Sequence, residues 1–269
     1  MIIERKKRKG RLGAVTVMLL ALLLFSSPPR MGFSAETDRD ILANLRQIEL
    51  TQMDYDREAD PYFAYVPGTI PVLVSAPHGT KHYRAAEGRW RSEDAYTSSL
   101  AVELGRLTGA HVLYARNKAP EDANNDTDGA YKEFLERLVK EKGIKFILDL
   151  HGAEGDRPFN VDIGVRESAV AACSCPTYRE IVAKTFSGFG SELFNQQFPA
   201  SSEGTITSFA RNKLGIEAAQ IEINANYRIV ESKTTGFKAD PSHVLDMVKR
   251  LAALIRAIGQ EAAGISPGS

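Results

Sequence analysis

Two of the five histidines in the sequence stand in the same local context. His78 and His151 each follow a short apolar run and precede a glycine, in residues 77–79 (Pro-His-Gly) and 150–152 (Leu-His-Gly). An imidazole nitrogen at the end of a strand can bind a metal ion, and a glycine beside it lets the backbone turn tightly and lets a substrate approach. The repeated pattern predicts that His78 and His151 share one metal ion, with their rings no more than about 5 Å apart.

The other three histidines have weaker claims on a metal. His82 lies four residues after His78, within reach of the same site, and stays a weaker candidate. His111 opens a predicted strand and His243 lies in the first turn of the last predicted helix, so both are interpreted as structural.

A catalytic zinc ion typically has three protein ligands and one open position, and the third ligand is commonly a carboxylate. Glu87, Glu93 and Asp94 all lie between His78 and the body of the next predicted helix. Acidic side chains in the first turn of a helix are also stabilised by the helix dipole without any metal. The residues alone therefore leave the choice among these carboxylates open.

Glu222 stands in a strand pattern in which Gln220, Glu222 and Asn224 share one face. An exposed sheet face would account for this polar row. A central parallel strand, however, is expected to be apolar on both faces, so a carboxylate within it needs a partner or a function. A general base would be such a function, because it takes the proton of an attacking water and passes it to a leaving nitrogen.

Short apolar runs typical of buried strands alternate with amphipathic helical patterns. Strands are predicted over residues 69–76, 111–115, 145–150 and 218–223. Helices are predicted over residues 129–142, over residues 92–109 with Ser92 as the cap, and from Asp240 onward. A further helix is predicted over residues 178–194, with a break at Gly188 or Gly190 as the alternative. This order predicts an α/β protein, a single three-layer domain with a mostly parallel central sheet and helices on both faces. Ligands bind beyond the carboxyl ends of such strands, where His78, His151 and Glu222 are expected to converge.

The first 35 residues have the layout of a secretory signal. Six basic side chains within residues 5–11 precede an apolar run over residues 12–25, followed by Ser-Ser-Pro-Pro. The run is shorter than the roughly 20 residues of a membrane-spanning helix, although an uncleaved anchor is the alternative. We expect a signal or anchor in residues 1–35, a catalytic domain in 36–263, a disordered tail in 264–269 and a secreted or extracytoplasmic protein.

The charge of the chain depends on that leader. Residues 36–269 contain 27 basic and 33 acidic side chains, a net charge of −6. An acidic body disfavours nucleic acid as a partner, because phosphates require a basic surface, and membrane contact is expected only through the leader. Cys173 and Cys175 are too close to pair without strain and lack the second pair of a zinc site; they are interpreted as incidental thiols or as a bond to another chain.

Four segments resemble the N-formylglutamate amidohydrolase family, which is similar in fold to zinc carboxypeptidases. They are residues 74–79 (VSAPHG), 92–96 (SEDAY), 148–152 (LDLHG) and 220–224 (QIEIN) with Tyr227 behind the last. Residues 122–124 (DAN) resemble a weaker family segment, although Asn125 stands where an arginine is common. The matches follow the family's order over most of the chain after the leader.

The resemblance implies zinc on His78, His151 and an acidic residue, for which Asp94 is the first choice, with Glu222 as the base. Zinc carboxypeptidases usually place a carboxylate three residues after the first histidine, but that position is Lys81 here. Substrate-binding candidates are Asn124, Arg116 and Arg211, since an arginine can bind a carboxylate or polarise a carbonyl.

The sequence thus predicts an exported zinc-dependent amidohydrolase that uses metal-activated water. Its substrate would be an N-formyl or N-acyl amino acid, or a small peptide that bears a carboxylate. One alternative is a zinc peptidase acting on poly-γ-glutamate or peptidoglycan peptides. The other is a non-catalytic binding protein on the same fold. A serine hydrolase is disfavoured because the sequence has no Gly-x-Ser-x-Gly elbow.

Overall fold

The computed structural model describes residues 37–165 and 176–264 of the chain. The predicted leader, Cys173, Cys175 and residues 265–269 lie outside this part, so the interpretations made for them stay predictions. Within the described residues, no helix combines the length and the apolar character needed to span a membrane.

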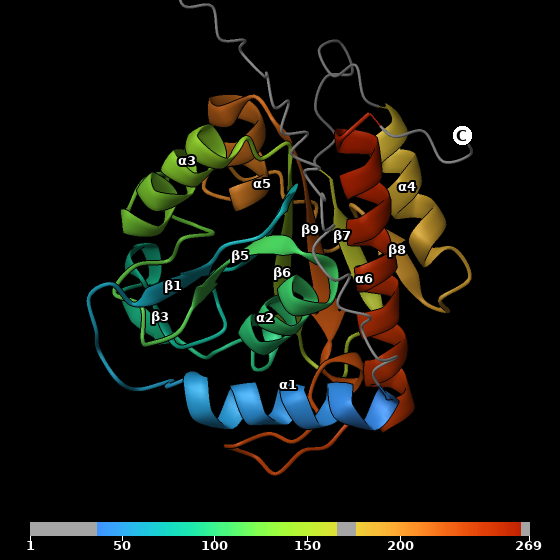
Figure 1. Ribbon diagram of the computed structural model, residues 1–269. Coiled ribbons are helices and arrows are strands. Elements are labelled where there is room, and N and C mark those ends of the chain that lie inside the picture. Colours follow the sequence, from blue (N-terminus) through green and yellow to red (C-terminus); the bar gives the residue numbers. More distant parts are fainter. Residues whose placement is uncertain (1–36, 166–175, 265–269) are drawn as a thin grey trace, which may run out of the picture. The chain divides into compact units, whose positions relative to one another are not determined.

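The core of the protein is a seven-stranded sheet in the order β1-β5-β2-β6-β9-β7-β8 (Figure 1). The strands are β1 (Phe63–Val66), β2 (Ile70–Ala76), β5 (Ala110–Ala115), β6 (Phe146–Ala153), β7 (Val161–Gly164), β8 (Glu192–Phe194) and β9 (Glu217–Asn224). The four central strands β5, β2, β6 and β9 are parallel, whereas β1 and β7 run antiparallel to their inner neighbours. A separate hairpin pairs β3 (His82–Arg84) with β4 (Arg89–Arg91).

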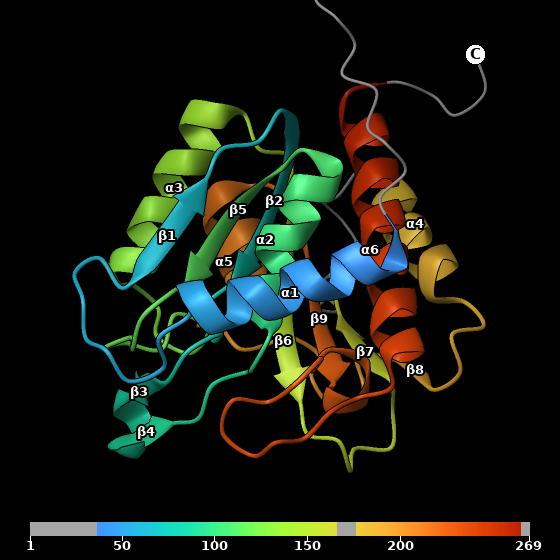
Figure 2. The same ribbon diagram turned by 60° about the horizontal axis from the view of Figure 1, so that its bottom comes forward.

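Helices cover both faces of the sheet (Figures 1 and 2). One face packs against α1 (Asp38–Gln52), α2 (Thr97–Thr108), α4 (Pro176–Phe186) and α6 (Pro241–Ala262), which share one hydrophobic core with it. The other face packs against α3 (Ala130–Lys142) and α5 (Ile206–Phe209), which form a second core. Short turns of helix occupy η1 (Ala85–Glu87), η2 (Ala210–Leu214) and η3 (Ala225–Tyr227). The predicted three-layer α/β domain with a mostly parallel sheet is confirmed.

The two faces of the central strands differ in polarity. In β9, Ile221 and Ile223 lie in the core shared with α6, whereas Gln220 and Glu222 alternate with them and point to the opposite face. In β6 the odd-numbered positions from Ile147 onward share that second face, and two of them, Asp149 and His151, are polar. The second face therefore turns from apolar to polar toward the carboxyl ends of the strands.

Three predicted element boundaries are wrong. The helix expected from Ser92 begins only at Thr97, after Tyr96 in the left-handed conformation (φ 70°), so Glu93 and Asp94 lie in a loop and the helix dipole does not account for them. The helix expected over residues 178–194 ends at Phe186, just before Gly188 and Gly190 where a break was the alternative, and residues 192–194 form β8. The central strand continues to Ala153, which places His151 inside β6 and not after it.

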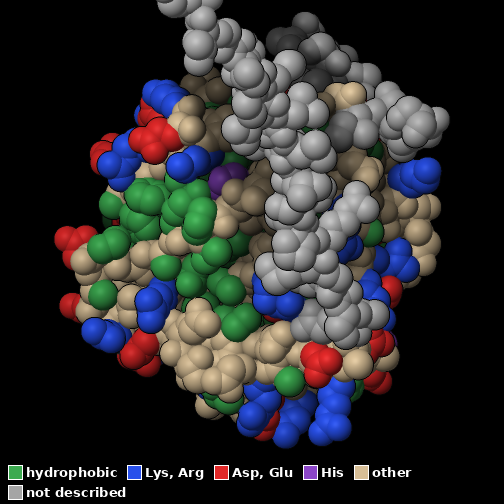
Figure 3. Space-filling view, viewed as in Figure 1, with side chains coloured by type: hydrophobic (Ala, Val, Ile, Leu, Met, Phe, Trp, Pro, Cys, Tyr) green, Lys and Arg blue, Asp and Glu red, His purple; other side chains and the backbone are tan. Residues whose placement is uncertain are grey.

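The edge strand β1 has a hydrophobic surface of its own. The ring of Tyr65 packs on Phe134 of α3 with 6.0 Å between their centroids, and Val66 is exposed. Figure 3 shows hydrophobic side chains gathered in this region of the molecule, between charged groups. None of the candidate metal ligands, His78, Asp94 and His151, belongs to β1.

Candidate metal centre

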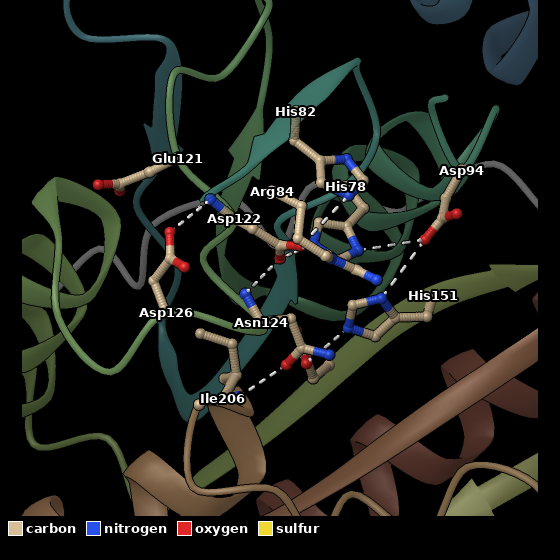
Figure 4. Close-up of polar contacts among 12 residues, drawn as sticks. His78, His82, Arg84, Asp94, Glu121, Asp122, Asn124, Asp126, His151 and Ile206 are labelled. Atoms are coloured by element: carbon tan, nitrogen blue, oxygen red, sulfur yellow. Dashed lines mark hydrogen bonds and ion pairs between the residues drawn. The ribbon is translucent and has the colours of Figure 1, made fainter. Parts of the chain in front are cut away.

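His78, Asp94 and His151 come together although 73 residues of sequence separate the two histidines. His78 follows β2, Asp94 lies in the loop before α2, and His151 lies near the end of β6. Figure 4 shows both rings directed toward the Asp94 carboxylate. The ring centroids of the two histidines are 4.8 Å apart, within the limit expected of two imidazoles that share an ion.

The spacing of these three groups suits a small cation better than direct hydrogen bonds. Oδ2 of Asp94 lies 3.7 Å from Nδ1 of His78 and 3.4 Å from Nδ1 of His151, longer than normal N–H···O bonds. Ligand atoms bound at about 2.0–2.1 Å with tetrahedral angles lie about 3.3–3.4 Å apart. The two nitrogens and the oxygen could therefore serve as three ligands of one ion.

The far side of each ring is held by a buried carboxylate. Nε2 of His78 is 2.7 Å from Oδ1 of Asp122, and Nε2 of His151 is 2.9 Å from Oδ2 of Asp149. Both aspartates are fully buried. Such partners keep the proton on Nε2 and direct the lone pair of Nδ1 toward the metal position.

Sequence reasoning had singled out neither aspartate as a partner of a histidine. Asp149 could have been found, because it lies two residues before His151 in a strand and so shares its face. Asp122 is 44 residues from His78, and only the fold reveals that contact.

The charges at the centre are strongly coupled. Burial opposes protonation of His78 and His151, but Asp122 and Asp149 outweigh it and raise the pKa of each ring above its ordinary value. Burial likewise opposes ionisation of Asp94, yet the two neighbouring rings hold its pKa below the ordinary value. Binding of a cation at this centre therefore competes with protonation of the two histidines.

His82 lies at the centre but is not directed toward the point that His78, Asp94 and His151 share. Its ring stacks on that of His78 with 3.8 Å between centroids and 3° between planes. Burial lowers its pKa to about 3, so the ring is neutral. His78, His82 and Asp122 form a second group of potential ligands. The Nε2 atom of His78 is already bonded to Asp122, so we interpret His82 as packing that fixes the plane of His78.

Glu222 lies beside the three ligands on the neighbouring strand. It pairs in register with His151 across β6 and β9, and side chains at paired positions of adjacent strands share a face about 5 Å apart. Burial raises the pKa of Glu222 to about 7, an effect that the nearby His151 partly offsets. This is the range expected of a general base at neutral pH.

Asn124 holds Glu222 in place through Gln220. The Asn124 side-chain amide donates to Oε1 of Gln220 (3.1 Å), and Nε2 of Gln220 donates to Oε1 of Glu222 (3.0 Å). The Asn124 carbonyl oxygen accepts from the backbone N–H of Ile206 (2.8 Å). Asn124 thus lies at the site as expected, but these contacts fit a positioning role better than the predicted contact with substrate.

The structure does not bring the two predicted arginines to the centre. Nε of Arg116 donates to the backbone oxygen of Gln52, 3.2 Å away at the end of α1. Arg211 donates to Glu217 and Ala218 at the start of β9, whereas Glu222 lies near the other end of that strand. Both side chains are turned toward local acceptors, a direction that sequence spacing does not encode.

The alternative third ligands are also accounted for. Glu87 accepts from arginines of the β3–β4 hairpin, and Glu93 has no described contact with either histidine. Lys81, at the position where carboxypeptidases usually have a carboxylate, pairs with Asp56 at 2.6 Å. Among the residues that the structure describes, Asp94 is the carboxylate that faces both Nδ1 atoms.

The glycines after the histidines make room for neighbouring side chains. Neither Gly79 nor Gly152 has a positive φ. A Cβ on Gly79 would lie 1.8 Å from Oγ of Ser98, and one on Gly152 would lie 2.5 Å from Nη2 of Arg228. Arg228 is buried and donates to three backbone oxygens around the centre. The expected turn is present at Gly79, where the chain turns and bends after β2, but the same expectation is wrong for Gly152, which lies inside β6. Both glycines also let Ser98 and Arg228 pack behind the candidate ligands.

No protein-family model matches the sequence, and no curated protein matches it. Solved structures share the fold. N-formylglutamate amidohydrolase from Ralstonia eutropha JMP134 has a TM-score of 0.52 and 16% identity, over 75% of this chain and 98% of that chain. A bacteriophage poly-γ-glutamate hydrolase has a TM-score of 0.46 and 12% identity, over 78% and 94% of the two chains. A metallo-carboxypeptidase from Burkholderia cenocepacia has a TM-score of 0.43 and 13% identity, over 83% and 69%.

The first of these similarities confirms the fold that the sequence motifs predicted. At such low identity it establishes the fold alone. The activity has to be argued from the residues of this chain.

Proposed function

We propose that the protein is a zinc-dependent amidohydrolase that cleaves the C–N bond of an N-acyl amino acid or of a small peptide bearing a carboxylate. The observation that carries the proposal is the orientation of the two histidines. Each turns Nδ1 toward Asp94 and has Nε2 fixed by a buried aspartate. Two imidazole nitrogens and one carboxylate are a ligand set typical of catalytic zinc.

Three residues would hold the ion, and each contributes a different property. His78 and His151 supply neutral nitrogen ligands whose direction Asp122 and Asp149 fix. Asp94 supplies one negative charge from the loop before α2. A bound zinc ion supplies Lewis acidity, which lowers the pKa of water to about 7 and polarises a carbonyl.

Glu222 is proposed to move the protons. As a carboxylate it accepts a proton from the attacking water while the water oxygen bonds to the carbonyl carbon. It then returns that proton to the amide nitrogen as the C–N bond breaks, which leaves a carboxylic acid and an amine. Its burial makes it a stronger base than an exposed glutamate, and Gln220, held by Asn124, fixes one of its oxygens.

The substitution Glu222→Gln tests this assignment. We expect kcat to fall roughly 10²- to 10⁴-fold, the usual contribution of a general acid–base group, while bound zinc and thermal stability are retained. Arg211→Gln, in η2 and bonded to the start of β9, serves as the control and should keep its activity. A Glu222→Gln protein that hydrolyses amides at the normal rate would contradict the role of Glu222. A wild-type protein that binds zinc but cleaves no amide would favour a binding protein.

The place of action belongs to the same proposal. The basic and apolar leader in residues 1–35 supports export of the protein from the cytoplasm. Outside the cytoplasm, N-acyl amino acids and cell-wall peptides are available as substrates. Fractionation of cells that produce the full chain tests this point: we expect the protein outside the cytoplasm, and a cytoplasmic pool would argue against it.

A further inference from the structure

The β3–β4 hairpin turns one of its two faces toward the metal centre. The register pairs His82 with Arg91 and Arg84 with Arg89, and because side chains alternate along a strand, these four share a face. His82 on that face stacks on His78, and Nε of Arg84 donates to Asp122 at 2.6 Å. Figure 4 shows His82 and Arg84 reaching from the hairpin to the histidines.

The rest of the hairpin fixes this orientation. On the opposite face Tyr83 packs edge-on against Trp90, with 5.4 Å between ring centroids, and the Lys118 ammonium lies 3.8 Å from the Trp90 ring. The backbone N–H of Tyr83 donates to the oxygen of Ala119. Figure 2 shows β3 and β4 at the edge of the molecule toward which β6 and β9 point.

Three guanidinium groups on this face share a single carboxylate. Oxygens of Glu87 lie 3.1 Å from Nη1 of Arg84, 2.7 Å from Nε of Arg89 and 3.3 Å from Nη1 of Arg91. The side chains become more exposed away from the centre, from 24% for Arg84 to 39% for Arg91 and 63% for Arg89. Asp122 offsets part of the charge of Arg84, whereas Arg89 and Arg91 share Glu87 as their acidic partner among the described residues.

We propose that this arginine face, made of Arg84, Arg89 and Arg91, binds a second carboxylate of the substrate, remote from the amide that is cleaved. The inference rests on the proposed function and narrows its substrate class to extended acidic amides, chains that carry more than one carboxylate. Guanidinium groups bind carboxylates through paired N–H donors. The face also concentrates positive charge on a body whose net charge is −6, so it would steer an acidic chain to the centre.

Arg89→Gln combined with Arg91→Gln tests the proposal without touching Asp122. The probes are tri-γ-glutamate and the same trimer with carboxamides in place of the carboxylates distal to the cleaved bond. We expect KM for the acidic trimer to rise about tenfold with little change in kcat, the effect of losing charged hydrogen bonds, and KM for the amidated trimer to stay the same. Arg256→Gln removes an exposed arginine of α6, which donates to the backbone oxygen of Leu107 near the end of α2, and is the matched control.

Glu87→Gln is expected to change KM in the opposite direction from the double arginine substitution. If the arginines bind substrate, Glu87 competes with the incoming carboxylate, so its removal should lower KM for the acidic trimer several-fold, most strongly at low salt where exposed charges are least screened. If Glu87 and the arginines only stabilise the hairpin, the substitution should instead lower thermal stability and weaken both substrates alike. That result would overturn the inference.

Binding to the Glu222→Gln protein separates this inference from the proposed function. Calorimetry should give a tighter Kd for the acidic trimer than for the amidated one, and Arg89→Gln with Arg91→Gln should remove the difference. Equal affinity for the two trimers overturns the inference even if the enzyme cleaves amides. A preference for the acidic trimer sustains it even if no amide is cleaved.

Discussion

Two carboxylates in this protein, the buried Glu49 and the half-buried Asp94, have opposite surroundings. Glu49 of α1 accepts hydrogen bonds from the hydroxyl of Tyr55 and, at 2.5 Å, from that of Ser99, and Lys233 lies 3.9 Å away. Asp94 also lies among potential donors, but the ring nitrogens of His78 and His151 stand 3.7 and 3.4 Å from it.

The difference separates a structural carboxylate from a ligand. The donors of Glu49 approach to direct contact, so the group is satisfied by the protein itself. The partners of Asp94 are held back by Asp122 and Asp149, which bind the other side of each ring. A gap kept open by such a second layer of carboxylates is what a metal ion would fill.

Exchanging each carboxylate for a neutral residue gives the largest expected effects. Asp94→Ala should weaken zinc binding by more than the roughly 10- to 100-fold typical of losing a partner of a metal-bound histidine, and should abolish hydrolysis, with the fold of the metal-free protein retained. Glu49→Gln should leave zinc affinity intact and cost about 1–3 kcal/mol of stability, because buried hydroxyls lose a charged acceptor. Zinc titration and thermal unfolding of both variants check these expectations. Equal changes of zinc affinity in the two variants would contradict the assignment of Asp94 as a ligand and of Glu49 as a structural carboxylate.

Removing the second layer sharpens the comparison. Asp122→Asn and Asp149→Asn should each weaken zinc binding by roughly 10- to 100-fold, because an amide no longer favours the proton on Nε2. Competition with a chromogenic chelator measures the change. Asp246→Asn, which removes an exposed partner of Arg250, is the control. Unchanged zinc affinity in both aspartate variants would show that the rings are oriented by other contacts.

Glu222 predicts a pH dependence of stability in the metal-free protein. Burial raises its pKa from 4.5 to about 7, so the folded state holds a proton that the unfolded state has already released. Stability is therefore lost as pH rises from 4.5 to 7, by about 3 kcal/mol in total. Glu222→Gln should be more stable than wild type by up to this amount at pH 8, and the gain should vanish near pH 4. Denaturant unfolding at pH 4 and pH 8, with chelator present, measures the difference in stability between the two proteins. An equal difference at both pH values would exclude ionisation of Glu222 as its cause.

The packing behind His151 gives the smallest predicted effect. Gly152→Ala should cost about 1–3 kcal/mol, because the new Cβ would lie 2.5 Å from Arg228, which three backbone oxygens hold in place. Gly155→Ala is the matched control, since its Cβ would meet nothing closer than 3.4 Å. Chemical denaturation compares the two, and equal stability would mean that Arg228 moves freely.

Sequence reasoning found what periodicity and strand ends encode. Apolar runs located the four central strands, and the shared context of His78 and His151 identified the two rings that now lie 4.8 Å apart. The start of α2 was misplaced because Ser92 has the type of a cap while the helix begins after Tyr96, which makes no side-chain cap.

The remaining features depend on contacts between distant residues. Asp122 and His78 are 44 positions apart, and nothing in a run of sequence indicates that contact. Arg116 and Arg211 have the residue type expected of a substrate ligand, but rotamers and local acceptors turn them away. The arginine face of the hairpin became visible only through the register that pairs Arg84 with Arg89.

The most direct test of the central claim is X-ray absorption at the zinc edge of the purified protein loaded with one equivalent of zinc. The account predicts retained stoichiometric zinc with two imidazole nitrogens and oxygen ligands at about 2.0–2.1 Å, and one imidazole fewer in His151→Ala. A protein that retains no zinc, or whose zinc shows the same imidazole ligands after His151→Ala, would contradict it.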